Sequence, residues 1–231
     1  MRVGILYSGG KDSTYAIAEC QNKGWEIAYL LSVKPSRTDC FLFHYATVEH
    51  TPALAKILKL PHRLIGCDVA DPQKEAELIR TEVEQLPEVE ALVLGGTGLQ
   101  ETQLRNLQTA LRPLHVEVFA MHAGLDHEDL FRQMIRDGFE IRITQIAADG
   151  LTQDWLGRIV DERTFEQLKQ RSQKFGFHLG FEGGHADTLV TDCPLFDQKL
   201  EILESTAQME TECSGHLKIE RLQLVQKAKI L

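Results

Sequence analysis

Long apolar runs are missing from this chain of 231 residues, and so is a surplus of basic charge. No stretch approaches the ~20 consecutive apolar residues that a membrane-spanning helix needs. The sequence starts with strand-like residues rather than a basic segment and an apolar core, so we expect a cytoplasmic protein without a membrane partner. Acidic residues outnumber basic ones, 34 to 25. This balance disfavours extended binding to nucleic acid, because proteins that hold a long phosphate backbone carry a basic face.

Cysteines are few and widely spaced. The five are Cys20, Cys40, Cys67, Cys193 and Cys213. No two form a Cys-x-x-Cys pair and the count is odd, so neither a zinc ribbon nor a disulfide framework is expected. Cys193 stands before Pro194, and we expect it to be a buried thiol rather than a nucleophile. His122 and His127 are five residues apart, not four as in a helical zinc pair, so we expect solvated side chains.

The most informative segment follows the apolar run Val3–Tyr7. It reads Ser8-Gly9-Gly10-Lys11-Asp12-Ser13 and leads into an amphipathic stretch. Two adjacent glycines let backbone N–H groups converge on a phosphate, and a following helix directs the positive end of its dipole at the same anion. The two serines and Lys11 add donors, and Asp12 could hold Mg²⁺ against the phosphates. The pattern predicts a site for nucleoside phosphates.

This loop differs from the commonest phosphate-binding motifs. The nucleoside-triphosphate loop needs a glycine where Ile5 stands, and the dinucleotide fingerprint is not matched either. The order serine-glycine-glycine-any-aspartate-serine instead resembles the PP-loop of the ATP pyrophosphatases, which cleave ATP between its α and β phosphates and release pyrophosphate. The alternative without function is a tight turn in which Asp12 interacts with a helix dipole.

Strand and helix signals alternate over residues 1–122. We expect strands at Val3–Tyr7, Glu26–Val33, His62–Gly66, Ala91–Gly95 and Val116–Ala120. We expect helices at Ser13–Lys23, Val48–Leu58, Pro72–Leu86 and Glu101–Leu111, with Gly24 capping the first. This alternation predicts an α/β fold with a doubly wound, Rossmann-like parallel sheet. Ligands bind at the carboxyl ends of such strands, where the Ser8 loop, the Ser32–Asp39 segment and the Gly95–Gly98 loop would lie.

Residues 123–231 follow a different pattern, which predicts a second, smaller α+β domain. The expected elements are helices at Asp126–Asp137 and Glu162–Phe175, and strands at Glu140–Ile146, Thr188–Thr191, Glu201–Thr206 and Gly215–Lys227. A glycine-rich turn is expected at Gly180–Gly184.

Several stretches beyond the PP-loop resemble one family. Asp39–His44 is similar to Asp-Ser-x-Met-Phe-His, and Gly150-Leu151 with Leu156-Gly157 matches a Gly-Leu…Leu-Gly signature. Residues 182–188 and 192–196 resemble Glu-Gly-Gly-Glu-Tyr-Glu-Thr…Asp-Cys-Pro-Leu-Phe. Over nearly its full length the chain is similar to the diphthine–ammonia ligase (diphthamide synthetase) family of PP-loop, N-type ATP pyrophosphatases, whose fold is that of the adenine nucleotide α-hydrolases.

This resemblance implies an ATP-dependent ligase that forms a C–N bond. ATP would adenylate the carboxylate of diphthine on elongation factor 2, and ammonium would supply the amide of diphthamide, with AMP and pyrophosphate released. The implied cofactors are ATP and Mg²⁺, with Asp12 as the metal ligand. The implied ATP-binding residues are Ser8, Gly9, Gly10, Lys11, Asp12, Ser13 and His44. The implied catalytic residues are Asp12, Lys11 and Glu182. The implied acceptor-binding residues are Arg105, Glu182, Gly183, Gly184, His185 and Thr188, which assigns residues 1–122 to ATP and 123–231 to the acceptor.

The sequence also departs from the family. His185, Ala186 and Asp187 replace a glutamate, an aromatic residue and a glutamate, and Leu99–Thr102 replaces Ser-x-Tyr-Gln, so that only Arg105 matches there. A different small carboxylate is therefore an alternative acceptor. A tRNA-modifying PP-loop enzyme and a non-catalytic nucleotide sensor are further alternatives, which the net charge of −9 and the intact loop disfavour. The ammonia source and the oligomeric state, with a homodimer among the options, stay open.

Overall fold

The computed structural model describes residues 1–36, 47–96 and 101–227. Contacts divide the chain into two compact units, Met1–Gly124 and Leu125–Leu231. Each unit contains its own hydrogen-bonded sheet, five-stranded in the first and four-stranded in the second. An α/β unit thus precedes a smaller α+β unit, as the sequence predicts.

The first unit contains a parallel sheet in the strand order β3-β2-β1-β4-β5. The strands are β1 (Arg2–Leu6), β2 (Glu26–Pro35), β3 (His62–Cys67), β4 (Ala91–Leu94) and β5 (Glu117–Ala120). Successive strands add to one side of β1 as far as β3, and β4 then starts the other side. The order therefore reverses between β1 and β4, which is where doubly wound sheets bind ligands.

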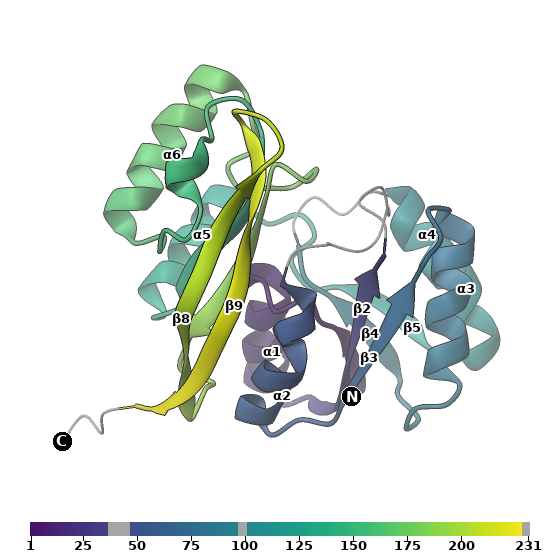
Figure 1. Cartoon of the computed structure of the whole chain (residues 1–231). Helices are drawn as coiled ribbons and strands as arrows, with labels where there is room; N and C mark the ends of the chain where they lie inside the picture. Colours follow the sequence, from purple (N-terminus) through teal and green to yellow (C-terminus); the bar gives the residue numbers. More distant parts are fainter. Residues whose placement is uncertain (37–46, 97–100, 228–231) are drawn as a thin grey trace. The chain divides into compact units, whose positions relative to one another are not determined.

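Helices cover both faces of this sheet. They are α1 (Lys11–Asn22), α2 (Thr51–Leu58), α3 (Pro72–Val83) and α4 (Glu101–Leu111), with short 3₁₀ turns η1 (Val48–His50) and η2 (Arg112–Leu114). Figure 1 shows α1 and α2 on one face and α3 and α4 on the other. All four residues of β4 are buried, as expected for a parallel strand covered on both faces. The doubly wound architecture is confirmed.

Strands β1 and β2 pack closely where a glycine of β1 faces a tyrosine of β2. Gly4 lies opposite Tyr29, which is only 1% exposed. A Cβ atom on Gly4 would lie 2.5 Å from the Cε2 atom of the Tyr29 ring. Burial raises the pKa of the Tyr29 phenol to about 12. The ring therefore occupies the space that a side chain on β1 would need.

Helix α1 ends as its sequence predicts. Gly24 has φ +67 and follows the cap residue Lys23. The N–H of Trp25 donates to the Cys20 carbonyl and that of Gly24 to the Gln21 carbonyl. This hydrogen-bond pair is the Schellman arrangement, which needs a left-handed residue after the cap.

The second unit is built on an antiparallel sheet in the order β7-β6-β9-β8. Its strands are β6 (Glu140–Ala147), β7 (Ala186–Asp192), β8 (Gln198–Met209) and β9 (Ser214–Gln226), and its helices are α5 (His127–Arg136), η3 (Gln153–Trp155) and α6 (Glu162–Phe175). The ring of Phe131 on α5 packs edge-on against Phe165 on α6 at 5.2 Å and against Phe181 at 5.8 Å. These aromatic contacts join both helices to the chain that enters β7.

Aspartates begin both long helices of this unit. The Asp126 carboxylate accepts from the N–H groups of Glu128 and Asp129, and that of Asp161 accepts from the N–H of Thr164. These backbone hydrogen bonds lower the pKa of both carboxyl groups. Gly176, in the left-handed conformation, closes α6.

The four cysteines in the described part of the chain are free thiols. Cys193 is 1% exposed, and burial raises its pKa to about 12, which confirms the expectation of a buried, unreactive group. Across the described segments, no helix has both the length and the hydropathy to cross a membrane.

Candidate functional site

The Ser8–Ser13 loop joins the carboxyl end of β1 to the start of α1, as predicted. Gly9 has φ +80, a conformation that favours glycine. Gly10 is the N-cap of α1 and, without a side chain, leaves the first turn without a side-chain cap. The first N–H groups of a helix have no intrahelical acceptor and attract anions. The local geometry therefore leaves room for an anion at this helix N-terminus, and binding of phosphate there stays a prediction.

The two serines of the loop bind each other across it. The hydroxyl oxygens of Ser8 and Ser13 lie 3.1 Å apart, and the Ser8 N–H donates to Ser13 Oγ at 3.2 Å. The Gly10 N–H also donates to Ser8 Oγ, at 3.3 Å. These contacts draw the two ends of the loop together and fix its curvature. The hydroxyls hold the loop in shape here, and direct binding of phosphate by them stays a prediction.

Lys11 and Asp12 form an ion pair beside the loop. The Lys11 ammonium donates to Asp12 Oδ2 at 2.6 Å. The Lys11 side chain is only 5% exposed, whereas 26% of the Asp12 side chain reaches solvent. The carboxylate is therefore the more accessible of the two groups, as a metal ligand must be.

The loop after β4 lies directly against the start of α1. A Cβ atom on Gly95 would lie 2.5 Å from the backbone C and O of Asp12 and 2.7 Å from the Ser13 nitrogen. Only glycine allows two backbones to approach this closely. The two loops at the point of strand reversal are therefore in contact at Gly95.

His122 binds Gly96, the next residue of that loop, and the sequence did not indicate this contact. Its side chain is fully buried, so the expectation that it is solvated was wrong. The Gly96 N–H donates to His122 Nδ1 at 3.3 Å, and the ring lies 5.8 Å from that of Tyr15 on α1. The position of His122 one residue after Met121, whose N–H pairs with the Leu94 carbonyl, explains this contact.

The segment after the second strand begins later than predicted, because β2 extends to Pro35. Ser32 is therefore a strand residue, and it is fully buried. The Ser32 hydroxyl donates to the Tyr7 carbonyl at 2.6 Å. His62 Nε2 lies 2.9 Å from the Ser32 hydroxyl oxygen. Burial lowers the pKa of His62. This chain of hydrogen bonds supports the residue from which the Ser8 loop starts.

Two predicted ligands are not brought to this loop by any contact described. His44 lies outside the described residues. Arg105 points into solvent from α4, with 69% of its side chain exposed, and pairs with Glu101 on the preceding helical turn. Its role in binding the acceptor stays a prediction.

The Glu182–His185 turn precedes β7 in the second unit and contains four of the predicted acceptor-binding residues, Glu182, Gly183, Gly184 and His185. Gly183 and Gly184 both have positive φ, +80 and +79. The Glu182 N–H donates to His178 Nδ1 at 3.3 Å, and the His178 N–H donates to His185 Nδ1 at 3.1 Å. Both Nδ1 atoms therefore act as acceptors for backbone N–H groups. The turn is thus closed by two imidazole acceptors.

A strained residue stands directly before this turn. Phe181 has φ +66 although it is bulky, and its ring is buried against Phe131 of α5. Left-handed backbone at such a residue costs on the order of 1–3 kcal/mol and clusters at functional sites. His178, which the sequence analysis did not single out, contacts the turn and stacks at 4.0 Å on His127. Its signal was a histidine seven residues before His185, too weak to identify without the fold.

The residues that depart from the family block are structural at this turn. His185 accepts the hydrogen bond described above, and Ala186 and Asp187 are buried at the start of β7. Thr188, a predicted acceptor ligand, is 8% exposed and pairs with Ile143 of β6. No group of three or more His, Cys, Asp or Glu side chains able to hold a metal ion occurs in the described ranges. A cation at Asp12 would therefore need oxygen ligands from elsewhere, which Mg²⁺ takes from phosphates and water.

Comparison with known proteins identifies the family. The diphthamide synthase N-terminal domain matches residues 1–116, and the diphthamide synthase C-terminal domain matches residues 126–225. The mouse diphthine–ammonia ligase is 30% identical, covering 98% of this chain and 94% of the mouse protein. The human diphthine–ammonia ligase is 31% identical over 87% of this chain and 82% of its own length. The fission yeast diphthine–ammonia ligase is 28% identical over 88% of this chain but only 36% of its own, longer sequence. The chain belongs to the diphthamide synthase family of C–N bond-forming ligases.

Proposed function

We propose that this protein is a diphthine–ammonia ligase that converts ATP to AMP and pyrophosphate. The observation that carries the proposal is the Ser8–Ser13 loop, an uncapped helix start with Gly95 against it, in a chain whose relatives are diphthine–ammonia ligases. ATP use follows from the family. The acyl-adenylate step, Mg²⁺ and elongation factor 2 as acceptor are part of the proposal.

In the first step, a carboxylate oxygen of diphthine attacks the α-phosphorus and pyrophosphate leaves. The N–H groups at the start of α1 and the Lys11 ammonium would stabilise the charge on the transferred and leaving phosphates. Asp12 has a partly exposed carboxylate beside them, which suits a Mg²⁺ ion that neutralises phosphate charge when bound. Catalysis here consists of positioning and charge stabilisation.

In the second step, ammonia attacks the acyl carbon and AMP leaves, so an ammonium proton must go to a base. Glu182 is the proposed base, because its backbone N–H is held by His178 and the residue before it, Phe181, has a strained backbone. The glycines after it let a substrate approach the backbone closely. The Glu182–His185 turn would thus supply the acceptor side of the reaction.

The test is turnover with defined acceptors. The purified protein is incubated with ATP, Mg²⁺, ¹⁵N-ammonium and elongation factor 2 carrying diphthine, and AMP, pyrophosphate and the labelled amide are measured. We expect all three products in equal amounts, and no AMP without the acceptor. Formation of ADP, or of AMP that needs RNA instead of diphthine, would contradict the proposal.

Two variants separate the steps. Asp12→Asn should slow AMP formation on the order of 100-fold. Glu182→Gln should slow amide formation by a similar factor but leave acceptor-dependent exchange of pyrophosphate into ATP intact. Glu88→Gln, at the opposite edge of the first sheet, and Glu212→Gln, on the β8–β9 turn, are exposed carboxylates that serve as controls. If the Asp12→Asn variant exchanges pyrophosphate into ATP at the wild-type rate, Asp12 is not part of the ATP site.

A different small carboxylate is the second candidate acceptor. The specific observation is that His185, Ala186 and Asp187 depart from the family block and that the last two are buried. A turn rebuilt in this way presents a different shape to the acceptor. AMP formation with a free carboxylic acid and ammonium, but not with diphthine on elongation factor 2, would favour this candidate.

A further inference from the structure

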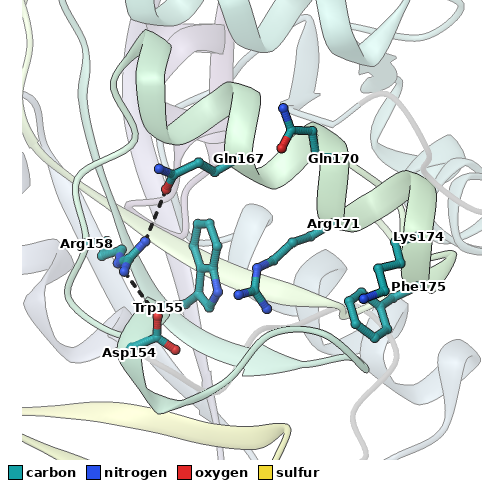
Figure 2. Close-up of a pocket in the computed structure, with 8 residues that line it drawn as sticks. All are labelled: Asp154, Trp155, Arg158, Gln167, Gln170, Arg171, Lys174 and Phe175. Atoms are coloured by element: carbon teal, nitrogen blue, oxygen red, sulfur yellow. Dashed lines mark hydrogen bonds and ion pairs between the residues drawn. The ribbon is translucent and has the colours of Figure 1, made fainter.

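A pocket of about 500 Å³ lies in the second unit, apart from the Glu182–His185 turn. It is lined by Asp154, Trp155 and Arg158 on one side and by Gln167, Gln170, Arg171, Lys174 and Phe175 of α6 on the other. Figure 2 shows these side chains around a common space. The volume lies within the roughly 300–1,000 Å³ of small-molecule sites.

Positive charge dominates this pocket. Three cations line it against one carboxylate, and Arg158 pairs with Asp154 at 3.1 Å. Arg171 and Lys174 form no ion pair with any carboxylate in the described part of the chain. Two positive charges are thus left for a ligand, and Gln167 and Gln170 add amide groups that can donate.

The arginines are held in place before any ligand arrives. Figure 2 shows the indole of Trp155 between Arg158 and Arg171, whose guanidinium carbons lie 4.7 and 5.4 Å from the ring centre. Arg171 Nη1 donates to the Gly150 carbonyl at 2.6 Å. Trp155 itself is 1% exposed and cannot move freely. Such fixed guanidinium groups bind oxyanions with little loss of conformational entropy.

The Gly-Leu…Leu-Gly signature shapes this pocket. Gly150 has φ +86, and a Cβ atom there would overlap the ring of Phe175. Leu151 is fully buried and anchors the segment, which then forms η3 and brings Trp155 to the pocket. The glycine therefore lets its own carbonyl reach Arg171 and lets Phe175 lie at the rim, 42% exposed.

We propose that this pocket binds a phosphate monoester of a sugar or nucleoside. A doubly charged phosphate group matches the two cations Arg171 and Lys174, and the guanidinium fork fits phosphate oxygens. A phosphate group alone would leave most of the volume unfilled. The exposed ring of Phe175 offers apolar surface to a sugar or a base.

The test uses Trp155 as the reporter. The chain has two tryptophans, and Trp25 lies in the first unit against Phe119. In a Trp25→Phe background, uridine 5′-monophosphate should change the emission of Trp155 saturably, and uridine should not, at constant ionic strength. Binding of inorganic phosphate with the same affinity would overturn the assignment of an ester.

Charge-matched variants locate the binding. Lys174→Gln and Arg171→Gln should each weaken affinity by about tenfold or more, because each removes a charged hydrogen-bond donor to the phosphate. Lys174→Gln is exposed, so folding does not depend on it. Arg163→Gln removes the same charge from the exposed start of α6 and should leave affinity unchanged. The absence of a saturable signal, or a signal that survives both pocket variants, would overturn the proposal.

Discussion

Among single residues, Gly95 sets the tightest constraint on the Ser8–Ser13 loop. Any Cβ atom at this position meets the backbone of Asp12, which cannot rotate away as a side chain would. The start of α1, whose N–H groups would hold the nucleotide, must then shift.

We therefore predict that Gly95→Ala weakens ATP binding and destabilises the protein by about 1–3 kcal/mol, the usual cost of overpacking. Gly66→Ala is the matched control, because a Cβ atom on Gly66 meets nothing within 4 Å. Urea unfolding and calorimetric titration with ATP measure the two effects. Equal stability and equal ATP affinity of the two variants would show that the close approach of Gly95 to the Asp12 backbone matters for neither property.

Sequence patterns predicted the residues of the Ser8–Ser13 loop and their place between strand and helix. They did not predict the contacts of His122 and His178. Each ring accepts a hydrogen bond from the backbone of a loop or turn, and that contact depends on the folded structure. His122 reaches Gly96 across 26 residues of sequence, and a single histidine carries no signal of such a contact. The positive φ of Phe181 was equally hidden, since bulky residues rarely adopt it.

At the scale of elements, the start of helix α6 depends on its N-cap residue, Asp161. The Asp161 carboxylate accepts from the Thr164 N–H at 2.7 Å, and this hydrogen bond lowers its pKa below the ordinary value of 3.8. A carboxyl group with a lowered pKa stabilises the folded state above its unfolded pKa. That contribution is lost as the pH falls through the folded pKa.

We predict that Asp161→Ala lowers the free energy of unfolding by about 1 kcal/mol at neutral pH, the usual cost of losing an N-cap. The difference from wild type should shrink as the pH falls below 3.8 and through the lower pKa of the folded state, where the carboxylate becomes protonated. Asp161→Asn keeps a capping oxygen and should lose less stability at neutral pH. Urea unfolding followed by Trp155 fluorescence in the Trp25→Phe background checks this, and a difference that grows in acid would refute it.

The bounds of helices were predicted with mixed success. Periodicity placed α4 and α6 at the residues where they occur, because apolar stripes are local signals, whereas α3 ends three residues earlier than predicted and α1 begins two residues earlier. Strand β8 was predicted at Glu201–Thr206 but extends over Gln198–Met209. Most of its side chains are exposed or half-buried and many are polar, so alternation is weak. Its length comes instead from pairing with β9 from Gln198 to Met209, with register shifts on either side of Glu204.

At the scale of the whole molecule, each of the two compact units contains its own sheet. We predict that a fragment of residues 1–124 folds cooperatively and binds ATP, but forms no amide. Circular dichroism, urea unfolding and calorimetry with ATP measure this, with the fragment 125–231 as the counterpart. Binding of ATP by residues 125–231 alone would contradict the assignment of the first unit.

Alternation of strands and helices predicted that the first sheet is parallel and doubly wound. It did not give the strand order β7-β6-β9-β8 of the second sheet, because antiparallel strands of similar composition can pair in several orders. That choice depends on side-chain packing between distant segments rather than on local patterns.

The contact between Gly4 and Tyr29 has an evolutionary consequence. The ring fills the volume above Gly4, so neither position can change alone without a clash or a void. Among relatives, a lineage that gains a side chain at position 4 should also carry a smaller residue at position 29. Positions 4 and 29 would then covary among relatives, although 25 positions separate them in the chain.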